Sequence, residues 1–200
     1  MSIVRKVRAV EKLYGELQQA ISTFQSNTGL QCVSGCGLCC QKPDIEATIL
    51  EFLPFAYHLY IHGKAYEWLD KMEHHQDDHI CTLFAPLHVD VQKGMCSQYL
   101  YRGMICRLFG FSASMNKYGQ PVLATCKMIK TAQADHYEKA QQAVSEGMQI
   151  PIMRHYYSRL CAIDHRLTEK FYPINQAILF AIETVLAYYD YRGKKLPKAG

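Results

Sequence analysis

The chain has 200 residues, of which 49% are hydrophobic and 20% are charged. This length suits one domain with a real hydrophobic core, and the composition excludes a disordered or fibrous protein. The formal net charge of +4 counts every cysteine as neutral. Four thiolates that hold a divalent ion carry a net charge of about −2, so two such sites would bring the total to about zero. The charge therefore gives no indication of nucleic-acid binding.

The nine cysteines are unevenly distributed, because eight lie between Cys32 and Cys126 and only Cys161 lies outside. Such local density is typical of disulfide scaffolds, but those are short secreted chains. The N-terminal segment is charged and lacks an apolar core, so we expect no signal peptide. The apolar runs are also shorter than the roughly 20 residues of a membrane span. We therefore expect a cytoplasmic protein, without membrane association, whose partner is a metal ion or cluster.

Helical periodicity predicts helices in the first part of the chain. From Ser2 to Thr28, apolar residues recur at steps of three and four, and Gly29 supplies a stop. A second helix is expected over residues 44–61, with Asp44 as its N-cap and Pro54 as a point where it kinks or divides. A short helix over residues 64–76 follows.

The middle of the chain loses this periodicity. From His79 to Thr125 there are short β-like pieces and a turn signal at residues 116–119, so we predict an irregular region with at most one small β-hairpin. The C-terminal third predicts three helices, over residues 131–146, 151–165 and 168–191.

The expected fold is therefore mainly α and forms a single domain over residues 1–200. A helical shell, built from the terminal regions 1–28 and 131–192, surrounds an irregular cysteine-rich region over residues 32–126 that binds metal.

The cysteine spacing indicates metal ligation. In Cys36-Gly37-Leu38-Cys39, the C-x2-C step beside a glycine lets the backbone curl so that two sulfurs converge on one ion. Neighbouring side chains cannot easily share one mononuclear centre, so Cys40 is expected to serve a second site or a polynuclear cluster. The candidate ligands are Cys32, Cys36, Cys39, Cys40, Cys81, Cys96, Cys106 and Cys126. Cys161 lies on the apolar face of a predicted helix and is expected to belong to the core.

Three segments, CVSGCGLCC, ICTLF and GMCSQYLYRGMICRLFGF, resemble the YkgJ-type cysteine-cluster family, described as a zinc- or iron-chelating domain of the CxxCxxCC type. The resemblance spans roughly residues 32–126. Its matching positions are the eight cysteines above together with Tyr99, Arg102 and Arg107. The chain departs from the family pattern in two places. The first spacing is C-x3-C rather than C-x2-C, and Gly103 stands where proline is usual, which suggests a looser turn before Cys106.

Thiolates suit zinc and iron–sulfur clusters equally well, so the sequence leaves the metal open. The resemblance extends to flagellin lysine N-methylase, which implies an iron–sulfur-dependent redox or methyl-transfer enzyme as an alternative. The C-x3-C-x2-C spacing also coincides with that of radical SAM enzymes, but the chain lacks the length and the strand–helix alternation of their barrels. A zinc-stapled interaction module is a third possibility. Whether the protein is an enzyme stays open.

Two further groups are candidates for the site. Arg102 and Arg107 flank Cys106 and are predicted to support the cofactor by hydrogen bonds to sulfur, with anion binding as the alternative. His74, His75 and His79 could bind a metal through a shared helical face. The polar run around these histidines is better explained as a solvated helix end.

Overall fold

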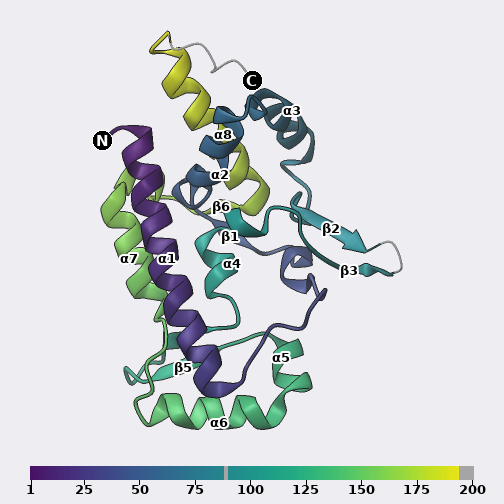
Figure 1. Ribbon diagram of the computed structural model, residues 1–200, viewed down its shortest axis with the longest axis vertical. Coiled ribbons are helices and arrows are strands. Elements are labelled where there is room, and N and C mark those ends of the chain that lie inside the picture. Colours follow the sequence, from purple (N-terminus) through teal and green to yellow (C-terminus); the bar gives the residue numbers. More distant parts are fainter. Residues whose placement is uncertain (88–89, 194–200) are drawn as a thin grey trace.

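The computed structural model describes residues 1–87 and 90–193. It is built mainly from helices, as predicted, and it also contains three small two-stranded sheets (Figure 1). None of the helices within these residues is long and apolar enough to cross a membrane.

The first helix, α1, runs from Ile3 to Thr28 and confirms the prediction from periodicity. Ser2 caps its N-terminus, and Gly29 ends it with a φ of 72°, in the left-handed region that glycine tolerates best. One stripe of α1 is buried, and each large apolar side chain on it contributes about 1.5–3 kcal/mol through burial. The buried residues are Ile3, Val7, Val10, Leu13, Tyr14, Leu17, Ile21 and Phe24.

The region expected to form one helix over residues 44–61 is divided. Residues 46–47 form strand β1, Ile49–Phe52 form a 3-10 turn (η2), and helix α2 covers Leu53–Ile61. Pro54 lies in the first turn of α2, which a proline tolerates, so it divides the predicted helix. The predicted N-cap at Asp44 is wrong because Thr48 and Glu51 form a capping box four residues later.

The remaining helices follow the predicted order with shifted ends. The expected helix over 131–146 is divided at Gln133, and the last helix begins at Ile174 because Pro173 sits in a strand just before it. The helices are α3 (Ala65–His75), α4 (Met104–Leu108), α5 (Lys127–Ala132), α6 (Ala134–Ser145), α7 (Met153–Ile163) and α8 (Ile174–Asp190). Short 3-10 turns are η1 (Leu38–Gln41), η3 (Tyr99–Tyr101) and η4 (His165–Leu167).

The middle region contains two β-hairpins where the sequence predicted at most one. Strands β4 and β5 flank the predicted turn, and Asn116 Oδ1 accepts backbone hydrogen bonds from Tyr118 and Gln120 there. The second hairpin, β2–β3, has no such turn signature in its sequence. The strands are β2 (Phe84–Leu87), β3 (Asp90–Cys96), β4 (Ser112–Met115) and β5 (Pro121–Ala124), and β1 (Glu46–Ala47) pairs with β6 (Tyr172–Pro173).

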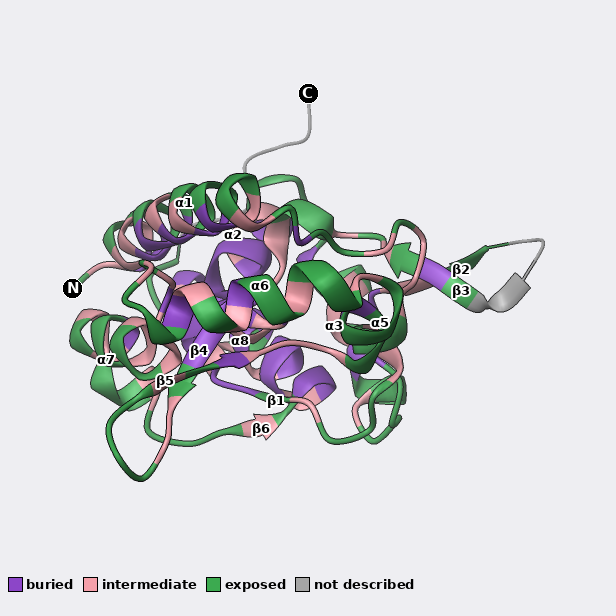
Figure 2. Ribbon diagram, turned by 90° about the horizontal axis from the view of Figure 1, so that it is seen from below, coloured by how far each residue is buried: buried purple, intermediate pink, exposed green. Residues whose placement is uncertain are grey.

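The core lies where α8 packs against α2 and α3, while α1 closes one side and contacts α7 (Figure 1). In Figure 2 the buried segments concentrate in α2, α8 and the inner side of α1, whereas the β2–β3 hairpin projects from the body. This arrangement places the cysteine-bearing segments at the edge of the core, between the helices and the projecting hairpin.

Candidate metal centre

The first four candidate cysteines lie on a loop that follows α1 and on turn η1. The loop curls twice through glycines with positive φ, 66° at Gly35 and 59° at Gly37. The Cys36 N–H donates to the Val33 carbonyl at 3.3 Å, and the Cys40 N–H donates to the Gly37 carbonyl at 3.0 Å. The knuckle predicted from the C-x2-C spacing is therefore present in the backbone.

This loop is docked on the β2–β3 hairpin. A Cβ atom on Gly37 would lie 2.5 Å from the ring of Phe84 and 2.8 Å from the carbonyl oxygen of Gly94, so no larger residue fits there without a shift. Gly94 in turn donates its N–H to the Gly35 carbonyl at 3.0 Å. Cys96 ends β3 opposite Phe84. The docking thus brings Cys96 to the knuckle.

Cys81 is joined to the same knuckle by the backbone, because its N–H donates to the Cys40 carbonyl at 2.9 Å. The segment before it is held by Asn175, a fully buried residue of α8. Asn175 Nδ2 donates to the carbonyls of His75, Asp78 and Ile80 at 3.2, 3.0 and 2.9 Å.

The other end of the same amide holds the segment after Cys81, because Asn175 Oδ1 accepts the Thr82 N–H at 2.9 Å. Sequence analysis did not single out Asn175. The sequence feature that could have indicated its role is a polar amide side chain near the start of an otherwise apolar helix.

Cys106 lies on α4, whose N-terminus is held by the buried carboxylate of Glu51. Glu51 Oε2 accepts the Ile105 N–H at 2.9 Å, and Oε1 accepts the Thr48 N–H at 2.8 Å. Burial raises the pKa of Glu51 to about 7, although these backbone hydrogen bonds lower it. Glu51, which the sequence analysis also missed, ties the Cys106 helix to η2.

Gly103, where the family pattern has proline, packs tightly against this pair. A Cβ atom there would lie 2.9 Å from the Phe52 ring and 3.1 Å from Glu51 Oε2. The sequence suggested a looser turn before Cys106, but the turn is tightly packed against these two side chains. Glycine is present because the neighbouring side chains occupy the space that a larger residue needs.

Cys126 and Cys32 are brought together by α5, because Cys126 caps its start and Gln133, just after its end, holds the residue before Cys32. Cys126 is the N-cap of α5, and its Sγ accepts the Ile129 N–H at 3.4 Å. Gln31, next to Cys32, exchanges two hydrogen bonds with Gln133: its N–H donates to Oε1 at 3.0 Å, and its carbonyl accepts from Nε2 at 2.7 Å.

All eight candidate cysteines are free and gather in one region. Cys39 lies near enough to Cys32, Cys81, Cys96 and Cys106 for the charges of the thiolates to interact. Similar proximity links Cys32 to Cys36 and Cys126, and Cys40 to Cys81 and Cys106. Over residues 1–87 and 90–193, however, no three His, Cys, Asp or Glu side chains converge closely enough to hold a metal ion. Binding would require the thiols to rotate toward a common centre.

The thiols differ in their tendency to ionise. A hydrogen bond from Cys40 lowers the pKa of Cys39 to about 6, and the same bond, followed by burial, raises the pKa of Cys40. Burial raises the pKa of Cys81 to about 12 and also raises that of Cys106. Gathered thiols of this kind fit a thiophilic metal, because a bound cation replaces the protons that burial otherwise keeps on sulfur.

The two arginines predicted to support the centre lie beside it. Arg102 lies near enough to Cys32, Cys39 and Cys96 to favour their thiolates. The hydrogen bonds observed for the arginines go to carbonyls, from Arg102 Nε to Tyr99 at 3.0 Å and from Arg107 to Arg102 and Leu100. These contacts fix the chain between Cys96 and Cys106, and the expected hydrogen bonds to sulfur stay a prediction.

The histidine run forms a solvated helix end, which agrees with the preferred interpretation. Helix α3 ends at His75, so His79 lies outside the helix and shares no helical face with it. His74 Nδ1 contacts the Asp70 carbonyl at 2.7 Å, and His75 Nδ1 contacts Asp78 Oδ2 at 2.8 Å.

Cys161 lies on α7, away from the gathered thiols in sequence. It is half-buried and does not belong to the hydrophobic cluster, so the expectation that it is a core residue is wrong. The apolar face of α7 is narrower than predicted, since Leu160 is the one buried residue of that fully described helix.

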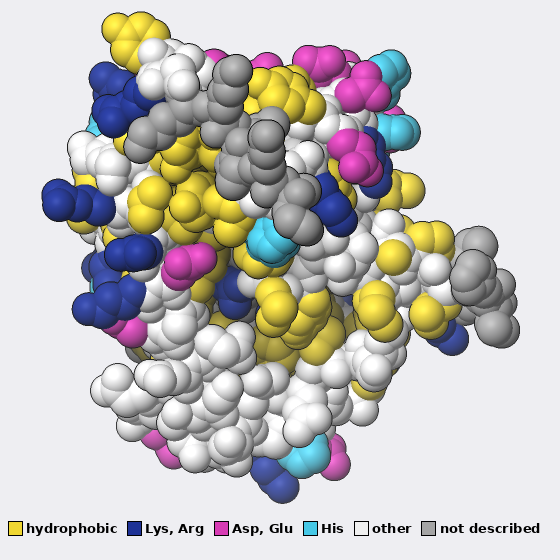
Figure 3. Space-filling view, turned by 45° about the horizontal axis from the view of Figure 1, so that its top comes forward, with side chains coloured by type: hydrophobic (Ala, Val, Ile, Leu, Met, Phe, Trp, Pro, Cys, Tyr) yellow, Lys and Arg dark blue, Asp and Glu magenta, His cyan; other side chains and the backbone are white. Residues whose placement is uncertain are grey.

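Exposed apolar side chains surround the thiols. Three of them are directly next to a cysteine in sequence and three lie two to four residues away, and Leu100 is 81% exposed. Apolar side chains cover the hairpin and continue into the middle of the face in Figure 3. The exposed residues nearest to cysteines in the sequence are Leu38, Ile80, Met95, Tyr99, Leu100 and Met128.

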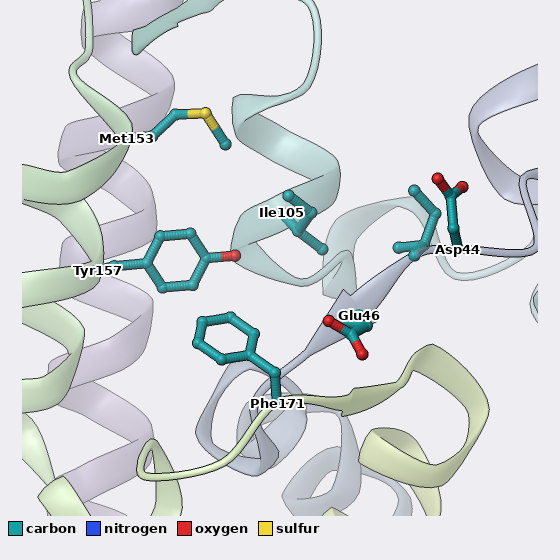
Figure 4. Close-up of a pocket in the computed structure, with 7 residues that line it drawn as sticks. Asp44, Glu46, Ile105, Met153, Tyr157 and Phe171 are labelled. Carbon is teal, nitrogen blue, oxygen red and sulfur yellow. The ribbon is translucent and has the colours of Figure 1, made fainter. Parts of the chain in front are cut away.

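A cleft of about 320 Å³ is lined by Ile105 of α4 together with residues from β1 and the chain before it, from α7 and from the chain before β6 (Figure 4). Its wall is apolar on one side, where Ile105, Met153, Tyr157 and Phe171 meet, and the carboxylate of Glu46 lies across from them. The cleft reaches α4 one residue before Cys106.

The fold and the gathered thiols define a helical cysteine-cluster protein. A family model described as a "putative zinc- or iron-chelating domain", CxxCxxCC, matches residues 31–141. The chain belongs to this family, as its sequence motifs indicated. No curated protein and no solved structure matches the chain significantly.

Proposed function

We propose that the chain binds metal through its eight clustered cysteines and that the bound centre, zinc or an iron–sulfur cluster, is a resident structural element. The observation that carries this proposal is the meeting of four separate segments at one set of thiols. These segments contain Cys32–Cys40, Cys81, Cys96–Cys106 and Cys126.

A structural role is supported by what the first of these segments lacks. Residues 31–45, all of them described, include no buried residue, so this stretch contributes little to the hydrophobic core. Its position depends on backbone hydrogen bonds and on close glycine packing. A metal held by its thiolates would supply the missing stabilisation, as it does in small metal-dependent domains.

The arginines would support the bound centre through charge. Thiolate-rich centres are anionic, and the Arg102 guanidinium lies near three of the thiols. The centre also requires reduced thiols, which the cytoplasm maintains, so we propose a cytoplasmic location and a single cooperative unit over residues 1–200.

The proposal is tested by anaerobic purification followed by elemental analysis and a visible spectrum. Matched iron and sulfide with visible absorption would identify a cluster. Stoichiometric zinc in a colourless protein would identify zinc centres and exclude redox chemistry.

A second candidate is an iron–sulfur-dependent enzyme for redox or methyl transfer, in line with the resemblance to flagellin lysine N-methylase. The observation that favours it is the cleft beside α4, whose volume is at the lower end for small-molecule sites. Iron, sulfide and a ligand-dependent change in the cluster spectrum would support it.

A third candidate is a zinc-stapled interaction module. It is favoured by the exposed apolar side chains beside the cysteines, among them Leu100 and Tyr99. Zinc without iron would be consistent with this candidate and with the structural role.

A further inference from the structure

A pair of histidines on α2 lies apart from the thiols in a geometry suited to metal. His58 lies in the last turn of α2, and His62 is the C-cap residue that follows it. The backbone N–H of His62 donates to the His58 carbonyl at 3.2 Å, so this last turn places the two side chains next to each other. Their ring centroids are 4.1 Å apart. The rings are therefore in contact at an interplanar angle of 42°. Two rings that bind one ion through Zn–N bonds of about 2.0–2.1 Å lie farther apart than rings in contact, so the two side chains would turn apart to reach a common ion.

The hydrogen bonds of the pair leave the outer nitrogens free. His62 Nδ1 lies 2.8 Å from the His58 carbonyl oxygen. A carbonyl only accepts, so Nδ1 carries the proton and Nε2 of the neutral ring has a free lone pair. Metal-binding histidines in proteins commonly show this arrangement, with one nitrogen tied to a carbonyl and the other on the ion.

His58 is oriented in a similar way by a side chain. Its Nδ1 lies 2.7 Å from the Tyr101 hydroxyl, which can either donate or accept. An ion on Nε2 selects the tautomer in which Nδ1–H donates to the tyrosine oxygen. Tyr101 belongs to η3, between Cys96 and Cys106, so the pair is connected to the segment that carries two of the candidate cysteines.

The surroundings keep the pair accessible and favour the neutral ring of His58. His62 is exposed and His58 is half-buried. Burial, together with the nearby charges of His62 and Lys64, lowers the pKa of His58, which favours the neutral ring. Burial and the nearby charge of Glu11 on α1 raise the pKa of Tyr101, which keeps its hydroxyl neutral beside His58.

We propose that His58 and His62 form a second metal site, of imidazole type, that takes one borderline divalent ion such as Zn²⁺, with water in its remaining positions. Imidazole nitrogens prefer zinc, copper and nickel over the hard ions Mg²⁺ and Ca²⁺. This proposal does not depend on the cysteine centre. A plain alternative is that the two rings only stack and close the end of α2.

The test is a Zn²⁺ titration of the full-length reduced protein against a chromophoric chelator. We expect two classes of binding, a tight class from the thiolates and a weaker class of one equivalent. His62→Ala and His58→Ala should each remove the weaker equivalent and leave the tight class intact. His155→Ala, which removes an exposed histidine of α7, should behave as the unaltered chain. If the unaltered chain bound only the weaker equivalent and lacked the tight class, that result would instead contradict the cysteine centre.

Nuclear magnetic resonance of the imidazole nitrogens tests the same claim without substitution. After the tight class is filled, further Zn²⁺ should shift the Nε2 resonances of His58 and His62, and those of His155 should stay in place. Identical titrations for the unaltered chain and His62→Ala, or shifts confined to other histidines, would overturn the proposal.

Discussion

The backbone N–H of Cys81 donates to the carbonyl oxygen of Cys40 over 2.9 Å. This bond joins the knuckle after α1 to the segment that enters the β2–β3 hairpin. The hairpin then returns Cys96 to the same place, because Cys96 lies opposite Phe84. Backbone pairing therefore brings together the segments that carry Cys40, Cys81 and Cys96.

Replacement of single ligands should lower the metal content. Cys36→Ser, Cys39→Ser, Cys96→Ser and Cys106→Ser each remove a soft donor from the gathered thiols, so elemental analysis should find less metal per chain. Cys161→Ser is the matched control because Cys161 lies on α7 and outside the cysteine-rich region. Unchanged metal content in all four variants would show that these thiols are not ligands.

Asn175→Ala should both destabilise the fold and weaken metal binding. The substitution leaves the Thr82 N–H and three carbonyls without their partner, which should cost about 2–4 kcal/mol in denaturant unfolding. The segment that carries Cys81 then loses its anchor to α8. The metal affinity of the folded variant should therefore fall. An affinity equal to that of the unaltered chain would show that Asn175 does not position Cys81 for metal binding.

Glu51 should make stability depend on pH. Its pKa of about 7 in the folded chain exceeds the ordinary value of 4.5, so the folded state binds the proton more tightly. The stabilisation of the fold by proton binding to Glu51 is complete below about pH 4. It is lost as the pH rises through about 7, by roughly 3 kcal/mol in total.

Urea unfolding at several pH values tests this expectation. The unfolding free energy of the unaltered chain should fall relative to that of Glu51→Gln as the pH rises from about 4 to about 8. Glu67→Gln, an exposed change on α3, should show a constant difference. A constant difference for Glu51→Gln as well would contradict the expected shift in its pKa.

Gly37→Ala should separate the cysteine loop from the hairpin. Its φ of 59° strains any residue with a Cβ atom, and that atom would collide with Phe84 and Gly94, for a cost of about 1–3 kcal/mol. Gly15→Ala is the control, because nothing lies within 4 Å of its Cβ position on α1. It should stabilise the protein by about 0.5–1 kcal/mol. Equal effects of the two changes on thermal unfolding would contradict the close packing.

The sequence predicted well the parts of the fold that local patterns determine. All eight buried positions of α1 follow from its periodicity, and Pro54 marks the division before α2. The predicted cap at Asp44 failed because the chain there pairs with residues 172–173, a contact between distant segments. Local propensity carries no information about such pairing.

The same distinction applies to the candidate site. Spacing identified the knuckle and the eight thiols, because ligand patterns repeat in sequence. Glu51 and Asn175 hold the cysteine segments through contacts more than 50 residues away along the chain, from Glu51 to Ile105 and from Asn175 to Thr82. Only the folded arrangement reveals that these two polar residues are buried for that purpose.

Elemental analysis combined with thiol titration on anaerobically purified protein tests most directly whether the gathered cysteines hold metal. We expect stoichiometric zinc, or iron with matching sulfide, and slow reaction of the clustered thiols until a chelator is added. Metal-free protein in which all nine cysteines react at once would contradict it.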